Sequence, residues 1–167
     1  MRTRSLIFLV LLGTLTFLGA AGLIVQPCLA ANFTGRVVGI IDGDTIEVLH
    51  NGRAQKISLN GIDCPEKGQT YGIPAKHAVA DLAFRKEVTV QIYGHDKYKR
   101  TLAEVLLPDG TNVNHTLVKD GWCWWYRKYA PGDTTLKRLE AEAREGRKGL
   151  WADPQPVPPW EWRKRSR

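Results

Sequence analysis

Residues 33–48 read FTGRVVGIIDGDTIEV. The stretch is rich in β-branched residues and is interrupted by Asp42-Gly43-Asp44, which predicts two strands that meet at a bend. Asn51-Gly52 then supplies residues that tolerate the positive φ angles of a tight hairpin, and an alternating pattern resumes over residues 55–59. The folded domain is therefore predicted to begin with antiparallel β-structure from residue 33.

The remainder of the chain adds helices and further strands. Apolar residues recur every three or four positions over 73–86, 113–121 and 136–150, which predicts three amphipathic helices. Alternating patterns over 87–93 and 101–107 predict two more strands. This order favours a mainly β, or α+β, domain: a five-stranded OB-fold barrel capped by about three helices.

Residues 1–31 are set apart from this domain. Arg2 and Arg4 precede an uncharged apolar run over 6–25, and small residues follow it, which is the layout of a secretory signal. The run also matches the ~20 apolar residues that span a bilayer, so an uncleaved N-terminal membrane anchor is the alternative. Either reading predicts an extracytoplasmic protein that is secreted, periplasmic or anchored.

The expected domain covers residues 33–152, and a proline-rich, basic tail follows over 153–167. This composition predicts an extended tail. The sequence has 24 basic and 17 acidic residues, and removing Arg2 and Arg4 leaves a formal charge of 22 − 17 = +5. That surplus favours a polyanionic partner without indicating a fold. No protein partner is implied, and a monomer is expected.

Two pairs of carboxylates are the candidates for chemistry. Asp42 and Asp44 flank a glycine, and Asp63 and Glu66 flank a Cys-Pro dipeptide. Clustered carboxylate oxygens suit calcium or magnesium, whereas zinc prefers closely spaced cysteines and histidines, which this chain lacks. An ordinary Asp-Gly turn is the alternative reading of the first pair.

Three segments with these carboxylates resemble the staphylococcal nuclease (thermonuclease) family. They are Asp42–Thr45, Gly61–Glu66 and Asp96–Arg100, and their order and intervals agree with the family over 33–151. The resemblance implies a calcium-dependent endonuclease that hydrolyses phosphodiester bonds of DNA, with RNA as a second candidate substrate.

The resemblance also implies a role for each carboxylate. Calcium would be held by Asp44, Asp63 and the backbone carbonyl of Cys64, with Asp42 behind these ligands. Glu66 would be the general base. These roles are physically consistent, because a cation neutralises charge on the phosphodiester while a nearby carboxylate activates the attacking water.

By the same resemblance, Arg100 would bind the phosphate, and Lys97 and Tyr98 would contact the substrate's phosphate and base. One position departs from the family pattern. Ser58 stands where the family places an arginine, five residues before the second metal-binding aspartate. Lys56 would share the face of Ser58 on a regular strand and is the candidate replacement. The alternative function is a catalytically weak or inactive nucleic-acid-binding module.

Two cysteines, Cys64 and Cys123, remain once the N-terminal segment is removed. In an oxidising compartment such a pair is a disulfide candidate, and two free thiols are the alternative.

Aromatic residues cluster after Cys123. They suit either base stacking or core packing. Alternation predicts that Trp122 and Trp124 differ in exposure from Trp125. Tyr126 and Tyr129 are the expected substrate contacts.

Overall fold

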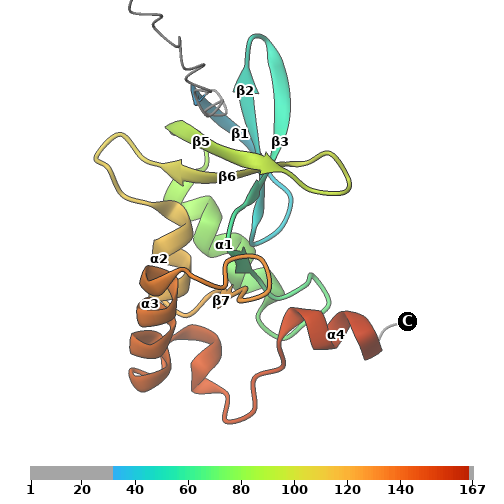
Figure 1. Ribbon diagram of the computed structural model, residues 1–167, viewed down its shortest axis with the longest axis vertical. Coiled ribbons are helices and arrows are strands. Elements are labelled where there is room, and N and C mark those ends of the chain that lie inside the picture. The colour runs from blue at the N-terminus through green and yellow to red at the C-terminus, as the bar shows by residue number, and fades with distance from the viewer. Residues whose placement is uncertain (1–31, 166–167) are drawn as a thin grey trace, which may run out of the picture.

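Five strands form a closed barrel in this structure, a computed structural model that describes residues 32–165 (Figure 1). The predicted signal or anchor therefore lies outside the described residues. Within 32–165 no helix has the length and apolarity needed to cross a membrane. The barrel strands are β1 (Phe33–Ile40), β2 (Thr45–His50), β3 (Arg53–Leu59), β5 (Glu87–His95) and β6 (Thr101–Leu106).

The strand order around the barrel is β1-β2-β3-β6-β5, and β5 closes the ring on β1. All neighbours are antiparallel except β3 and β6, which run parallel. Asn51 and Gly52 have φ angles of 49° and 74°, as a tight β2–β3 hairpin requires. The predicted OB-fold barrel is confirmed.

Three helices close one end of this barrel: α1 (Gly72–Ala83), α2 (Val113–Lys119) and α3 (Thr134–Glu145). The shared core is aliphatic, because alternate strand residues point inward and meet the apolar faces of the helices. Its fully buried members include Val37, Ile46, Val48, Ile57, Val90, Val105, Val79 and Leu117.

A second, very small sheet lies outside the barrel. It pairs β4 (Ile62–Asp63) with β7 (Trp124–Trp125) in antiparallel orientation, with Asp63 opposite Trp124. Strands of two residues have no recognisable periodicity, so the sequence did not predict this sheet. It places a predicted metal ligand directly beside the aromatic segment.

The helix predicted over 136–150 ends earlier than expected. α3 stops at Glu145, and a short 3₁₀ helix, η1 (Gly149–Ala152), follows. Arg147 and Gly149 take positive φ angles of 48° and 50°, which a continuous α-helix excludes. The turn lets Leu150 and Trp151 bury themselves in a second apolar cluster with Trp124 and Ala143.

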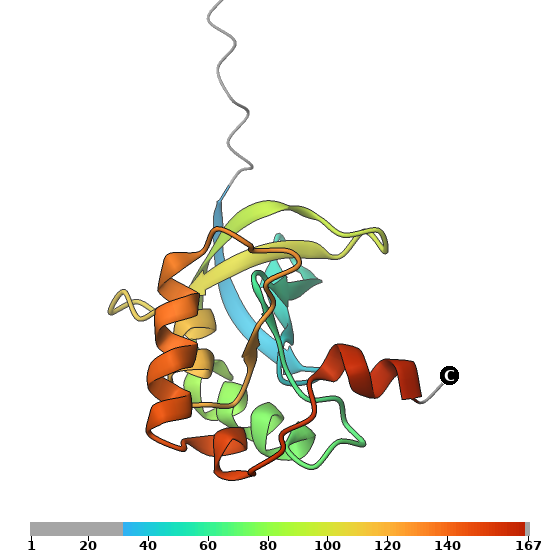
Figure 2. The ribbon, with the colours of Figure 1, turned by 60° about the horizontal axis from the view of Figure 1, so that its bottom comes forward.

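The prediction of an extended tail is wrong for its final part. Residues 159–165 form α4 (Pro159–Arg165), and in the described part of the tail residues 153–158 lack regular structure. Proline suits the first helical position, and the acidic Glu161 near the start and basic residues in the last turn complement the helix dipole. Both views place α4 beside the loop that joins β4 to α1 (Figures 1 and 2).

Candidate active site

The bend between β1 and β2 holds the first pair of carboxylates. Asp42 Oδ1 accepts the backbone N–H of Asp44 at 3.2 Å, and Thr45 Oγ1 donates to Asp44 Oδ1 at 3.1 Å. Asp44 Oδ2 accepts the backbone N–H of Cys64 at 2.8 Å. Asp44 therefore ties this bend to the second carboxylate segment.

Gly43 allows that approach because its site has no room for a side chain. A Cβ at this position would lie 2.8 Å from Cys64 Cβ and 2.9 Å from Ala75 Cβ. Contacts this short would force the backbone apart. The glycine between the two aspartates is thus required for packing the bend against the Cys64 loop and α1.

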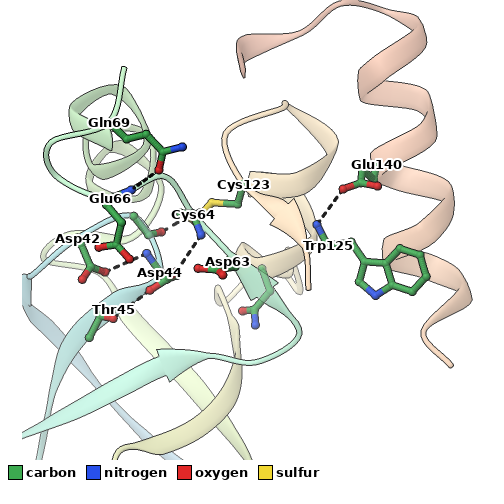
Figure 3. The surroundings of a disulfide bond; sticks show 12 residues. Asp42, Asp44, Thr45, Asp63, Cys64, Glu66, Gln69, Cys123, Trp125 and Glu140 are labelled. Carbon is green, nitrogen blue, oxygen red and sulfur yellow. Dashed lines mark hydrogen bonds between the residues drawn. A yellow bond between two sulfur atoms is a disulfide. The ribbon is translucent and has the colours of Figure 1, made fainter. Parts of the chain in front are cut away.

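The four predicted carboxylates come together in the folded chain. Figure 3 shows Asp42, Asp44, Asp63 and Glu66 gathered on one side of the disulfide between Cys64 and Cys123. Asp63 is buried and Glu66 is more exposed. The two segments that the sequence analysis singled out therefore build one acidic cluster.

The loop that carries Glu66 is held by local hydrogen bonds. The backbone N–H of Glu66 donates to Gln69 Oε1 at 3.1 Å, and its carbonyl accepts from Gln69 N at 2.8 Å. A Cβ added to Gly72 would fall 1.8 Å from the Glu66 carbonyl oxygen. The start of α1 is therefore packed against the backbone of the candidate base.

The charges in this cluster repel one another. Burial, reinforced by Asp42 and Asp63, raises the pKa of Asp44 to about 8. Burial also raises the pKa of Asp63, against the opposing effect of Arg163. A buried carboxyl group with the pKa of Asp44 holds its proton until a cation replaces it. An all-oxygen donor set suits a hard cation such as calcium. The residues present therefore fit the ion that the family resemblance implies.

Arg163 of α4 reaches into this acidic cluster, where no sequence motif placed it. Its Nη1 donates to Asp63 Oδ1 at 3.0 Å and to Glu66 Oε1 at 2.6 Å, and its Nη2 donates to Asp63 Oδ2 at 2.6 Å. The pKa of the guanidinium is raised above its ordinary value, chiefly by Asp63. The contacts span 97 to 100 residues of sequence, so no local pattern could indicate them.

Arg100 lies in a different set of contacts. Its Nε donates to Asp96 Oδ2 at 2.6 Å, and Asp96 Oδ1 accepts the backbone N–H groups of Tyr98 and Arg100. Lys97 Nζ lies 4.8 Å from the centre of the exposed Tyr98 ring. Within residues 32–165 no hydrogen bond or ion pair joins Arg100 to the four carboxylates.

Ser58 is buried on β3, opposite Thr45 of β2. It therefore lies beside the residue that bonds Asp44, where an arginine side chain would be near the acidic cluster. Lys56, the predicted replacement, is exposed and pairs across the strands with Glu47. The structure gives Lys56 no contact with the four carboxylates within its described part.

The disulfide joins the Cys64 loop to the segment that begins β7. Trp124 and Trp125 are both 6% exposed, so the predicted difference between them is wrong. Trp124 packs edge-on against Trp151, and Trp125 Nε1 donates to the carbonyl of Ala130, so each indole has its own buried environment.

The two tyrosines predicted to contact substrate lie at the surface beside these tryptophans. Tyr129 is 63% exposed, and its ring meets that of Tyr126 edge-on. Tyr126 stacks on Trp160 of α4 with a ring separation of 5.3 Å. Their contact with a substrate stays a prediction.

A cavity of about 620 Å³ opens next to this aromatic surface. It is lined by aromatic residues and by five cations, and one buried acid, Glu140, is already paired with Arg127 and Arg144. The cationic residues are Arg127, Lys128, Arg144, Arg163 and Lys164. Arg163 therefore belongs to both the cationic cavity and the acidic cluster.

A second group of potential metal ligands lies elsewhere. One ligand atom each from Glu104, His115 and Asp133 lie within 4.8 Å of one another. Both acids already have structural partners: Glu104 accepts from Asn112 Nδ2, and Asp133 caps α3. This group contains none of the residues predicted to bind metal.

Comparison with known proteins agrees with the fold and the motifs. The profile of the family described as "Staphylococcal nuclease homologue" matches residues 56–153. An uncharacterised endonuclease of Escherichia coli is 46% identical over 140 residues, which cover 84% of this chain and 91% of that protein.

Two further relatives match along most of their length. A micrococcal nuclease of Shigella flexneri is 43% identical over 157 residues, covering 89% of this chain and 90% of that protein. Protein ParB of Escherichia coli is 42% identical over 155 residues, covering 87% and 88% respectively. With its barrel, its acidic cluster and these matches, the chain belongs to the family of staphylococcal nuclease homologues.

Proposed function

We propose that this protein is an exported, calcium-dependent nuclease that hydrolyses phosphodiester bonds of DNA and of RNA. The observation that carries the proposal is the convergence of four carboxylates beside a cavity lined by five cations. A site that only bound the phosphate backbone would have no use for concentrated negative charge. The names of the nuclease relatives support the same activity.

In this proposal Asp44 and Asp63 hold the calcium ion together with the carbonyl of Cys64, and Asp42 supports them. The ion would supply charge neutralisation and orientation of the phosphodiester. Glu66 has a different task. It is the more exposed carboxylate of the second segment, and it would take a proton from the attacking water.

Hydrolysis joins the water oxygen to phosphorus while the bond from phosphorus to the leaving oxygen breaks. The leaving oxygen takes a proton from solvent. Negative charge grows on the phosphoryl oxygens during this step, so cationic side chains that face them would lower the barrier. The cations around the 620 Å³ cavity are the candidates for guiding the strand to this point.

A second function, a binding module with weak or no turnover, has specific support. Position 58, where the family resemblance places an arginine, carries the uncharged Ser58. The guanidinium of Arg100 is hydrogen-bonded to Asp96. If no arginine reaches the phosphate, the barrel would bind nucleic acid without cleaving it at an appreciable rate.

One experiment separates these functions. The exported form of the full chain is purified and tested on denatured DNA with calcium and with a chelator, alongside Glu66→Gln. Glu145→Gln on the exposed face of α3 is the matched control, because it removes the same charge from a residue that belongs neither to the cluster nor to the lining of the cavity.

A calcium-dependent activity that Glu66→Gln abolishes and Glu145→Gln preserves is the expected result. Cleavage that survives the chelator or the loss of Glu66 would refute the mechanism. Tight binding without cleavage would favour the binding module. Sequencing the N-terminus of the exported protein distinguishes a cleaved signal from an anchor over residues 6–25.

A further inference from the structure

The C-terminal segment is fastened to the candidate site by several independent contacts. Gln69, which bonds the backbone of Glu66, also donates through Nε2 to the carbonyl of Val157. The Trp160 ring lies parallel to that of Tyr126, at an interplanar angle of 1°, and meets Trp124 edge-on at 5.6 Å. α4 is therefore packed against the site on both its polar and its aromatic side.

This packing places the side chain of Arg163 against the carboxylates of the candidate site. Its guanidinium bridges Asp63, a predicted metal ligand, and Glu66, the predicted base. These three hydrogen bonds use three of the five N–H donors that a guanidinium has. The side chain is 39% exposed, so donor capacity remains on a group that solvent or a ligand can reach.

The surroundings of Arg163 indicate an anionic ligand beyond the two carboxylates. On its other side lies the cavity of about 620 Å³, whose remaining cations are Arg127, Lys128, Arg144 and Lys164. Arg127 and Arg144 are paired with Glu140, yet the charged residues around the cavity remain mostly cationic. A phosphodiester between that cavity and Glu66 would meet Arg163 directly.

Position 58 adds a reason for such a group. The site has a buried serine, on the strand beside Asp44, where the family resemblance places an arginine. A phosphate in a five-coordinate transition state requires donors on its equatorial oxygens, and an arginine fork matches them in pairs. α4 brings a guanidinium to the same cluster from a different part of the chain.

We propose that Arg163 is the second phosphate-binding arginine of this site, taking the role that Ser58 cannot fill. The inference rests on the proposed nuclease function. A metal ion held by Asp63 would compete with Arg163 for the carboxylate oxygens, and the guanidinium would then offer its donors to the phosphoryl oxygens. The opposite possibility is that Arg163 is a counter-ion that competes with the metal for the carboxylates. Removing a phosphate-binding Arg163 would lower kcat, whereas removing a competing counter-ion would raise calcium affinity and kcat.

The test compares Arg163→Gln and Arg163→Lys in the protein purified from cells that express the full chain. Arg165→Gln is the control, since it removes the same charge from the same helix. Within residues 32–165 the ion pair of Arg165 is with Glu161, at 4.0 Å, and not with the acidic cluster. Four quantities are measured: kcat and KM on denatured DNA with calcium, calcium affinity by calorimetry, and the affinity for a fluorescent single-stranded oligonucleotide. The binding arm uses a Glu66→Gln background so that the oligonucleotide is not cut.

Arg163→Gln is expected to lower kcat about 10²–10³-fold, by analogy with the loss of one preorganised donor, and to weaken oligonucleotide binding about tenfold or more. Arg163→Lys should recover only part of both, because an ammonium lacks the paired donors. Ser58→Arg introduced into Arg163→Gln should restore kcat. Arg165→Gln should behave like the wild type.

A wild-type rate in Arg163→Gln would overturn the inference. So would a higher rate with tighter calcium binding and unchanged oligonucleotide affinity, which would identify Arg163 as a counter-ion. If the wild type itself does not cleave, or cleaves without Glu66, the proposed function fails instead. The oligonucleotide arm would then still decide whether Arg163 binds phosphate.

Discussion

Calcium binding to this protein should release a proton from Asp44. The pKa of that carboxyl is raised to about 8 by burial and by its acidic neighbours. At pH 7 a group with this pKa is protonated in about nine molecules of ten, and a carboxylate must be deprotonated to ligate a metal. Binding should therefore release about 0.9 protons per calcium at pH 7, and affinity should fall about tenfold per pH unit below 8.

Calorimetry can count this proton directly. Calcium is titrated at pH 7 in two buffers that differ in their enthalpy of ionisation, and the difference in apparent binding enthalpy gives the number of protons released. Asp44→Asn should release fewer protons and bind calcium weakly, because Asp63 remains as a second carboxyl with a raised pKa. Equal enthalpies in both buffers, with an affinity that is constant from pH 6 to pH 8, would refute the assignment of a shared, proton-holding cluster.

The same carboxyl makes the stability of the metal-free protein depend on pH. Its folded pKa of about 8 lies above the ordinary value of 3.8, so between these limits the folded chain holds a proton that the unfolded chain has lost. Its contribution to stability is full below 3.8 and is lost as the pH rises toward 8. The Tm without metal should fall over this window more steeply in the wild type than in Asp44→Asn.

Three further changes test the supports of the site. Replacing Cys64 and Cys123 together by alanine should lower the free energy of unfolding by about 4 kcal/mol, from loss of the link across 59 residues, as measured by urea denaturation. Gly72→Ala places a Cβ 1.8 Å from the carbonyl oxygen of Glu66 and should cost about 1–3 kcal/mol and reduce kcat, as melting and cleavage assays would show. Glu140 is 2% exposed, accepts the backbone N–H of Trp125 in β7 and pairs with Arg127 and Arg144. Glu140→Ala should therefore lower the free energy of unfolding by about 1–3 kcal/mol in the same urea assay.

Each of these three has a clear contrary outcome. Unchanged unfolding after reduction of the wild type would mean that the cysteines are not joined. Gly132→Ala is the control for the glycine variant, because a Cβ there would meet nothing within 4 Å, and equal effects of the two would remove the packing argument. A Glu140→Ala variant as stable as the wild type would show that the ion pairs contribute nothing net.

The barrel was predictable because its determinants are local. Alternation within each strand and the positive φ of Asn51 and Gly52 fix the first hairpin without reference to distant residues. The two-residue pairing of Asp63 with Trp124 was not predictable, because it depends on where the folded barrel brings these segments. The same holds for the equal burial of Trp124 and Trp125.

The acidic cluster was predictable from motif spacing, but its cation was not. The tail was expected to be extended because prolines dominate residues 154–159, and that composition concealed a helix that begins at Pro159. α4 is stabilised by tertiary contacts: Trp160 stacks on the ring of Tyr126, and Arg163 pairs with Asp63. A proline at the first helical position followed by an acid and a basic run was the one local signal available.

The ion pairs between Arg163 and the carboxylates set an order in which the site can be completed. Glu66 and Arg163 are separated by 97 residues, so a ribosome finishes every carboxylate of the cluster long before it reaches their arginine. During that interval Asp63 and Glu66 lack the Arg163 guanidinium that pairs with them in the folded protein. A nascent chain that has reached only the prolines after η1 therefore carries an incomplete site, and translation of α4 is the step that completes it.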